Sequence, residues 1–432
     1  MTHADSKRRV VVTGMATVNP LADDVETYGD RLLAGVSGIG HWSSIDVSAL
    51  ECRIGGDLGD YDTAAALDSL AESIPQYSLA RARKLFKTST FANRLTMVCA
   101  LRAWLDAELF NATFDPFRAS SIVGGHNFNS RYITRNVHQF DEEPEYIDPL
   151  LGVEALDPNI AACTGEIVGL CGPTLTVGGA CASGNLALRA GFRDIVTGDC
   201  DLSVVSSAAF DMSAVDIQAS VILNALPVEP EFQQHPERAS RPFDTRRCGF
   251  VPSHGTGTMI LEELNCARRR GAPIWAELLG VAANANGDHL PAPSAPFQAR
   301  IMQQLLTATG THPEQVDYVN CHATSTPLGD LEEVRAIKAA FGDHAWRLKL
   351  NAPKSMLGHT CWAAPIVETI GGLVQMQRGQ LHPTINVDEV DPEIDLDICA
   401  NEPQEHETVY MLKNAFGFGG INCCSLYRRW DS

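Results

Sequence analysis

The segment "TVGGACASGN" places Cys181 between small residues, directly before a helical pattern. Small neighbours permit a strained strand-to-helix turn and leave room for a ligand beside the sulfur. The start of the following helix offers free N–H groups and a positive dipole end, so we expect it to favour the thiolate over the thiol. The structural alternative is a small apolar residue at a helix start, and the turn alone does not decide between the two.

Two further segments each place a histidine in a polar loop. "VDYVNCHATSTPLGD" puts His322 after an apolar strand, and "NAPKSMLGHTCW" puts Lys354 and His359 five residues apart. Neutral imidazoles can donate to a carbonyl oxygen and stabilise an enolate as it forms. A single histidine is usually a surface or core residue, but two in such loops indicate a site. "NAFGFGG" adds a turn whose N–H groups can face an oxyanion, with Phe416 and Phe418 as apolar walls.

The composition is that of a water-soluble globular protein, with 432 residues, 45% hydrophobic and 20% charged. This length predicts two domains or one large two-part domain. No apolar run reaches about 18 residues and the start lacks an apolar signal region, so we expect no membrane partner and a cytoplasmic location. The 13 cysteines show no metal-site or disulfide spacing and are expected to be reduced thiols. A net charge of -20 disfavours nucleic acid as a partner.

Strand and helix patterns alternate along the whole chain, which predicts a layered α/β fold. A β-branched run near the start is expected to end as a strand at Gly14. Helices are expected within 80–110 and from Cys181 to about Gly198. The acidic stretch 138–159 has three prolines and little periodicity, so it is predicted to be an irregular surface excursion. No low-complexity linker separates the two halves, so they are expected to pack as one unit.

In this order, the cysteine, histidine and glycine motifs resemble those of the β-ketoacyl-ACP synthases, the condensing enzymes of the thiolase superfamily. The resemblance runs from "RRVVVTGM" to "NAFGFGGIN", which is nearly the whole chain. It implies a five-layered αβαβα fold of two related halves, with the nucleophile in 1–262 and the two histidines in 263–432. It also implies a homodimer, no metal or nucleotide cofactor, and substrates carried on the phosphopantetheine of an acyl carrier protein (ACP).

The resemblance also implies roles for residues that match the family motifs. Cys181 would accept the acyl chain, while His322 and His359 would drive decarboxylation of malonyl-ACP. Lys354 would orient this network together with Glu333. Thr324 and Thr326 would bind the phosphopantetheine arm. Phe418 would be the gate beside the nucleophile, and the amides of Cys181 and Phe418 would form the oxyanion hole.

A basic cluster in "RARKLFK" stands out against the acidic chain. It consists of Arg81, Arg83, Lys84 and Lys87. Taken by itself, it is typical of a solvated helix face. The resemblance adds a second interpretation, because carrier proteins are acidic and a locally positive dock suits them.

Several motifs depart from the elongating enzymes and resemble a divergent branch, the stand-alone ketosynthase-like proteins of polyketide β-branching cassettes. "GGACASGN" replaces the usual "TACSS", and His254 stands where the family has a glutamate. Members of this branch generally carry serine in place of the cysteine and only decarboxylate malonyl-ACP to acetyl-ACP. The presence of Cys181 favours condensation, with such a decarboxylase and a non-catalytic, chain-length-factor-like subunit as alternatives. For His254 we expect a structural hydrogen-bonding role.

Overall fold

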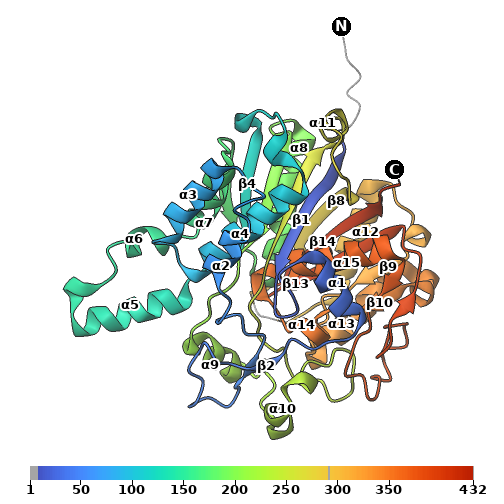
Figure 1. Ribbon diagram of the computed structural model, residues 1–432. Helices are drawn as coiled ribbons and strands as arrows, with labels where there is room; N and C mark the ends of the chain where they lie inside the picture. The colour runs from blue at the N-terminus through green and yellow to red at the C-terminus, as the bar shows by residue number, and fades with distance from the viewer. Residues whose placement is uncertain (1–7, 290–291, 432) are drawn as a thin grey trace.

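A computed structural model of the protein describes residues 8–289 and 292–431 (Figure 1). Within these residues, ten strands form one mixed sheet in the order β10-β9-β13-β14-β8-β1-β7-β6-β4-β5. The strands of its first half are β1 (Val10–Val18), β4 (Ala119–Gly124), β5 (Thr174–Val177), β6 (Leu202–Ser207) and β7 (Thr256–Glu263). Those of its second half are β8 (Ala276–Ala285), β9 (Tyr318–Asn320), β10 (Lys349–Asn351), β13 (Tyr410–Gly417) and β14 (Ile421–Arg429). Two small pairs lie outside it, β2 (Gly40–His41) with β3 (Ile54–Gly55), and β11 (Gln380–Leu381) with β12 (Gln404–Glu405).

The two halves of the sheet repeat one topology. When the strands of each half are numbered along the chain, both halves have the order 3-2-4-5-1. In both, the second strand pairs in parallel with its two neighbours, and the last two pairings are antiparallel. A short antiparallel contact between β1 and β8 joins the halves. The two related halves predicted from the family resemblance are therefore present in the strand order.

Helices complete five layers around the strands. The central layer is α8 (Ser183–Thr197) and α15 (Ala364–Arg378), since α8 packs against β4, β6 and β8 while α15 packs against β7 and β13. The outer layers are α4 (Phe91–Asp106) with α7 (Pro158–Val168), and α12 (Ala295–Thr309) with α13 (Pro327–Phe341) (Figure 1). The predicted thiolase-like αβαβα fold is confirmed. The other helices are α1 (Val25–Leu33), α2 (Thr63–Asp68), α3 (Gln76–Phe86), α5 (Ser130–Glu142), α6 (Leu151–Glu154), α9 (Ala214–Ile222), α10 (Pro230–Gln234), α11 (Leu264–Arg270) and α14 (Lys354–Leu357).

The prediction that the first strand ends at Gly14 is wrong. Strand β1 continues to Val18, with a register shift between Val12 and Gly14. A Cβ at Gly14 would lie 2.4 Å from the carbonyl oxygen of Ala103 in α4. Glycine is therefore required here because a helix crosses the strand closely, and not because the chain turns.

The acidic stretch is a surface excursion, as predicted, but it is not irregular throughout. Helix α5 extends to Glu142, and α5 and α6 project from the body of the molecule (Figure 1). The described buried residues of α5 are Tyr132 and Asn136, while Val137 and Phe140 are exposed. Ile133, Val137 and Phe140 recur at helical spacing, but most of this stripe precedes the acidic stretch, and Val137 and Phe140 face solvent instead of a core.

The functional motifs follow the carboxyl ends of strands. The cysteine turn follows β5, the first histidine loop follows β9, and the second histidine segment follows β10. The "FGFGG" turn joins β13, which is parallel to β9, to β14. Strands β9, β10 and β13 are parallel, so their carboxyl ends lie at one edge of the sheet and bring the two histidine loops and the "FGFGG" turn together. Strand β5 belongs to the other half, and the cysteine turn reaches these loops through the close contact of Gly179 with Gly417.

Candidate active site

Cys181 lies in a single 3-10 turn, η4 (Ala180–Ala182), between β5 and α8. The Ser183 hydroxyl oxygen accepts the N–H of Gly179 at 2.9 Å and donates to the carbonyl oxygen of Ala180 at 2.6 Å. Ala180 has a φ of +47°, a left-handed conformation that non-glycine residues rarely adopt. The turn is therefore strained and held by a side chain, and it presents a half-buried thiol.

The wall opposite the thiol is the turn after β13. A Cβ at Gly417 would lie 2.7 Å from the carbonyl oxygen of Gly179 and 3.2 Å from the nitrogen of Cys181, so only glycine fits this contact. The main-chain N–H groups of Cys181 and Phe418 are directed at the Cys181 sulfur, and both lower the pKa of its thiol. The Phe418 ring is 45% exposed. These are the two N–H groups expected for the oxyanion hole.

Burial controls the protonation of this thiol. It raises the pKa of Cys181 to about 11, while Lys354 and the two main-chain N–H groups oppose that rise. The expectation that the helix start favours a thiolate is therefore not met. The cost of taking a negative charge out of water outweighs the nearby positive groups, and Cys181 is a thiol at neutral pH.

His359 presents one ring nitrogen to the site. Its Nδ1 accepts the N–H of Cys361 at 3.2 Å, which places the ring proton on Nε2. The side chain is buried, and Nε2 has no partner among the described residues. The main chain of His359 is held by the carbonyl of Val251 at 2.7 Å and the N–H of Ser253 at 3.0 Å. A fixed backbone and a fixed tautomer leave one donor free for a ligand.

His322 lies beside His359, with ring centroids 5.6 Å apart and ring planes at 83°. Its other aromatic neighbour is Phe416, at 5.8 Å. The Glu333 carboxylate accepts the N–H groups of His322 and Ala323 at 2.8 and 2.7 Å. The loop that carries the first imidazole is thus held by a buried carboxylate on α13.

Both imidazoles are neutral. Burial, and then the charges of Lys354 and Lys413, hold the pKa of His359 well below the usual 6.5. The same causes, with His359 added, hold the pKa of His322 well below that value. A neutral ring can donate one hydrogen bond without carrying a charge. Each ring can therefore donate a hydrogen bond to the enolate oxygen as its negative charge develops, and neither ring has to be deprotonated beforehand.

A buried ion cluster lies behind the histidines. Lys354 Nζ donates to the carbonyl oxygen of His322 at 2.6 Å and lies 2.7 Å from Glu368 Oε1. Glu368 Oε2 accepts hydrogen bonds from both lysines, from Lys354 Nζ at 2.9 Å and from Lys413 Nζ. Lys354 thus pairs with Glu368 and not with Glu333, which binds the main chain of the His322 loop instead. Sequence reasoning missed Glu368 and Lys413, although a lone acid in the apolar helix "PIVETIGG" was an available signal.

Thr324 and Thr326 follow His322 in the same loop, with their hydroxyl oxygens 3.0 Å apart. Ser325 between them has a φ of +67° and donates its N–H to Asp330 at 3.1 Å. Both threonines are partly exposed. The loop therefore brings two hydroxyl groups close to the histidines and near the solvent.

The basic residues of the "RARKLFK" cluster lie apart from these loops, on or just after α3, which packs against α7. All four are exposed. Arg83 pairs with Asp68 at 2.6 Å, and Arg81 donates to a main-chain carbonyl. Among the described residues, Lys84 and Lys87 have no ion-pair partner.

His254 has contacts of a structural kind. It is fully buried, and its Nδ1 lies 3.1 Å from the nitrogen of Leu58 and 3.4 Å from Asp57 Oδ1. Its ring meets the edge of Trp42 at 5.0 Å between centroids. These contacts fit the hydrogen-bonding role expected for His254.

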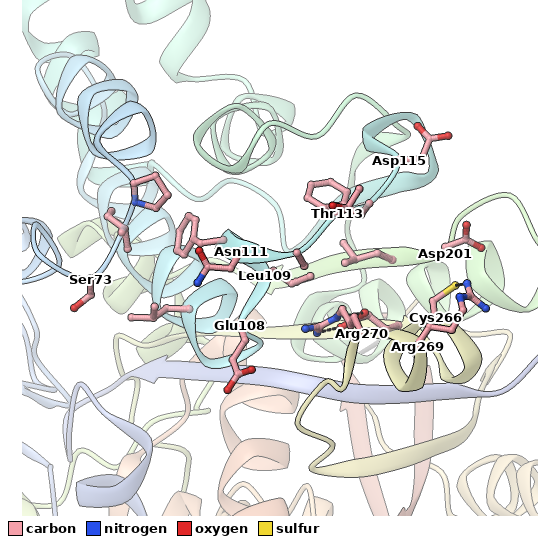
Figure 2. Close-up of a pocket in the computed structure, with 18 of the residues that line it drawn as sticks. Ser73, Glu108, Leu109, Asn111, Thr113, Asp115, Asp201, Cys266, Arg269 and Arg270 are labelled. Carbon is pink, nitrogen blue, oxygen red and sulfur yellow. Dashed lines mark hydrogen bonds and ion pairs between the residues drawn. The ribbon is translucent and has the colours of Figure 1, made fainter.

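A separate cavity of about 1210 Å³ lies away from the cysteine and histidine loops (Figure 2). Its walls include residues 108–115 and three residues of α11, Cys266, Arg269 and Arg270. Arg270 donates to the buried Glu262 and Arg269 to the Cys266 sulfur, and no residue predicted for the site lines this cavity.

Within the described ranges, no helix is long and apolar enough to cross a membrane.

Comparison with known proteins matches this fold and site to one family. The β-ketoacyl synthase N-terminal domain matches residues 7–267, and the C-terminal domain of the same family matches 275–388. The chain is 30% identical to 3-oxoacyl-[acyl-carrier-protein] synthase 2 of Staphylococcus aureus, with 98% of this chain and 99% of that protein covered. It is 33% identical to the enzyme of the same name from Coxiella burnetii, covering 96% and 97%.

Solved structures give the same result. A ketosynthase/chain length factor of ishigamide has a TM-score of 0.87 and 26% identity, covering 99% of this chain and 100% of that one. A type II polyketide ketosynthase in complex with its acyl-carrier protein has a TM-score of 0.83 and 26% identity, with the same coverage.

The chain belongs to the β-ketoacyl synthase family, the condensing enzymes of fatty-acid and polyketide synthesis. The predicted class, a 3-oxoacyl-ACP synthase and acyltransferase, is confirmed at this level. Ketosynthases act on substrates bound to ACP.

Proposed function

We propose that this enzyme joins an acyl group held on Cys181 to a two-carbon unit released from malonyl-ACP. One observation carries the proposal. Two main-chain N–H groups face the sulfur of Cys181, while a second loop system brings the neutral rings of His322 and His359 together. A nucleophile, an oxyanion site and an enolate site are the three parts that a decarboxylative condensation requires.

The first step transfers the acyl group. The sulfur of Cys181 attacks the acyl-ACP thioester carbonyl, and the negative oxygen of the tetrahedral intermediate accepts the N–H groups of Cys181 and Phe418. The bond to the pantetheine sulfur then breaks, and that sulfur leaves with the proton of the Cys181 thiol. The acyl group is now a thioester on Cys181, and no charge remains buried.

The second step generates the carbon nucleophile. Malonyl-ACP loses its carboxylate as CO2, and the electron pair of the broken bond passes into the thioester as an enolate. The enolate oxygen accepts Nε2–H of His359 and a second hydrogen bond from His322. Lys354 and Glu333 act through His322, because they hold its main chain at the carbonyl and at the amide.

The third step forms the carbon–carbon bond. The enolate carbon attacks the thioester carbonyl on Cys181, and the same two N–H groups receive the oxyanion. The intermediate collapses to β-ketoacyl-ACP and releases the Cys181 sulfur, which takes up a proton. Thr324 and Thr326 would bind the phosphopantetheine arm during these steps, since their hydroxyl groups lie in the loop that follows His322.

Product analysis tests the proposal. The wild-type enzyme is incubated with malonyl-ACP alone and with malonyl-ACP plus an acyl-ACP, and intact ACP species are weighed by mass spectrometry. We expect β-ketoacyl-ACP only in the second mixture. Acetyl-ACP in both mixtures, with no β-ketoacyl product from any of a series of acyl-ACP primers, would contradict condensation.

That second outcome would favour the divergent branch, in which the enzyme is a malonyl-ACP decarboxylase supplying a β-branching cassette. The sequence "GGACASGN" and the intact His322 and His359 support this alternative. The presence of Cys181 with two N–H groups on its sulfur favours condensation, because decarboxylation alone needs no acyl acceptor. The same residues oppose a non-catalytic, chain-length-factor-like role.

Helix α3 is the proposed docking site for the acyl carrier protein. Arg81, Arg83, Lys84 and Lys87 are exposed on a chain whose net charge is -20. An acidic carrier meets general repulsion from such a surface, so a local cluster of positive charge guides its approach.

A homodimer is proposed on two features of the surface. Strand β5 is at the edge of the sheet, and the projecting segment beside it exposes Val137, Phe140, Tyr146 and Leu156. Exposed apolar patches of this kind mark interaction sites.

We also propose a cytoplasmic location, in keeping with 13 free thiols. The proposed boundary between the halves leaves the nucleophile in 1–262 and the histidines in 263–432.

A further inference from the structure

Lys413 is a fully buried lysine on β13, four residues before the Gly417 contact. Its Nζ donates to Asn320 Oδ1 at 2.8 Å, to the carbonyl oxygen of Cys321 at 3.1 Å and to the Glu368 carboxylate. An unpaired buried ammonium is very costly, and this one has three acceptors. Its position is therefore specified by the surrounding structure.

The acceptors of Lys413 and Lys354 are adjacent in the chain. Lys413 binds the carbonyl of Cys321, and Lys354 binds the next carbonyl, that of His322. Glu333 accepts the N–H of His322 from the other side. The peptide units on both sides of His322 are thus held by charged groups, and each of these groups comes from a different element.

The charges behind the histidines are balanced only when Lys413 is counted. Glu368 and Glu333 are two buried carboxylates, and Lys354 and Lys413 are two buried ammonium groups. Without Lys413, the carboxylates would outnumber the lysines. Nearby negative charge in a buried site favours a protonated imidazole.

We propose that Lys413 is a second positioning residue of the decarboxylation site. Lys413 holds the main chain that leads into His322, and its positive charge keeps both imidazoles neutral. The proposal rests on the proposed function, in which His322 and His359 act as neutral donors. Lys413 itself acts through the Cys321 carbonyl and the Glu368 carboxylate, and not on the substrate.

Other titratable groups near the imidazoles also contribute to the net charge around the two rings. Burial and the two lysines lower the pKa of both rings. Burial also raises the pKa of the Cys181, Cys321 and Cys361 thiols, so these remain uncharged. The charges that act on the rings are those of Lys354 on α14 and Lys413 on β13. Glu368 on α15 pairs with both lysines, and Glu333 on α13 binds the main chain of the His322 loop. The thiols of the site and its loops are Cys181 in η4, Cys321 after β9, and Cys361 in η8 (Cys361–Ala363), whose N–H binds His359.

The test compares Lys413→Met with Lys413→Gln and with a control outside the cluster, Lys338→Met, at a half-buried lysine that pairs with Asp395. Methionine keeps the length of the side chain and removes its charge, while glutamine keeps an N–H donor for the Cys321 carbonyl. CO2 release from malonyl-ACP is measured from about pH 5 to about pH 9. We expect the acid limb to move up by about one pH unit in both Lys413 variants, because the histidines become easier to protonate. The plateau rate should fall about tenfold in the methionine variant and less in the glutamine variant.

The control Lys338→Met should keep the wild-type profile. NMR titration of the His322 and His359 ring signals in the same proteins reports protonation without turnover. If the acid limb and the ring titrations are unchanged in whichever Lys413 variant folds, the proposal is overturned, even when the rate is lower. If wild-type enzyme releases no CO2 from malonyl-ACP, the proposed function fails, and the ring titrations still decide the role of Lys413.

Discussion

At the scale of single residues, the site depends on groups that are neutral until substrate arrives. Cys181 is a half-buried thiol whose pKa is raised, and the imidazoles of His322 and His359 are uncharged. The N–H groups near the sulfur and the free Nε2–H of His359 are donors fixed by the main chain. Preorganised donors of this kind stabilise charge as it develops in the transition state, and they need no rearrangement to do so.

The rate at which Cys181 is alkylated should keep rising with pH. Only the thiolate reacts, and with a pKa of about 11 its fraction grows about tenfold per pH unit between about pH 7 and about pH 9. Iodoacetamide labelling, followed on the Cys181 peptide by mass spectrometry, measures this slope. The exposed thiol of Cys171 gives a reference in the same samples. A plateau near neutral pH would instead show that the helix start produces a thiolate.

Removing the nucleophile and removing a histidine should block different steps of the reaction. Cys181→Ala and Cys181→Ser should abolish condensation while CO2 release from malonyl-ACP continues. His359→Ala should lower CO2 release about 10²–10³-fold, because one preorganised donor to the enolate oxygen is lost. Both products are measured for each variant, with the exposed His235→Ala as a control. Loss of CO2 release in the Cys181 variants would contradict this division of roles.

At the scale of elements, the site is built from strand ends and from a turn that joins two strands. The β13–β14 turn approaches η4 so closely that Gly417 has no space for a side chain. This contact brings the N–H of Phe418 to the sulfur of Cys181. Helix α3 lies apart from that contact and presents the basic cluster to solvent.

Gly417→Ala should impair both chemistry and stability. The new methyl group would meet the Gly179 carbonyl at 2.7 Å and would push the turn away from Cys181. We expect condensation to fall about 10²-fold or more through loss of one oxyanion donor, and stability to fall by about 1–3 kcal/mol through overpacking. Gly152→Ala, where an added Cβ meets nothing within 4 Å, is the matched control. Wild-type turnover in Gly417→Ala would show that the turn does not form the oxyanion hole.

Reversing charge on the basic cluster should weaken the use of ACP substrates. The double variant Lys84→Glu, Lys87→Glu should raise KM for malonyl-ACP about tenfold at low salt, with kcat little changed, and added salt should reduce the difference. Arg347→Glu, a charge reversal at an exposed residue after α13, is the control. Equal effects from the two variants would indicate general repulsion by an acidic enzyme and not a docking site on α3.

At the scale of the whole molecule, one topology is used twice and only the two halves together make a site. The nucleophile follows a strand of the first half, and both histidines follow strands of the second. Helices α8 and α15 pack between the halves and carry Ser183, which holds the cysteine turn, and Glu368, which pairs with both lysines. The central layer therefore sets the distance between the acyl site and the enolate site.

The protein should be a dimer in solution, with about twice the chain mass of 46.7 kDa by light scattering. Phe140→Glu should shift it toward monomer, because a charge would replace an apolar side chain in the patch exposed on α5. Phe117→Glu, at a phenylalanine that is 72% exposed outside this segment, should leave the mass unchanged. A monomeric wild type, or a Phe140→Glu variant that stays dimeric, would exclude α5 from the interface.

Local signals in the sequence determined the class of fold, the order of the motifs, and the identity of Cys181, Lys354, His322 and His359 as site candidates. Strand periodicity, glycine turns and the residue types after each strand are properties of neighbouring residues, so they can be read from the chain. The sequence also marked the basic cluster on α3, although not what it binds.

Tertiary structure decided what depends on distant partners. It alone shows that Lys354 pairs with Glu368 and not with Glu333, and that Lys413 belongs to the same buried ion cluster. It also shows that Gly14 is a glycine because α4 crosses the strand closely at that point. Burial raises the pKa of Cys181 against the positive helix end, and burial is a property of the packed molecule. These outcomes are energies of contact and desolvation between segments far apart in the chain, and residue order by itself does not contain them.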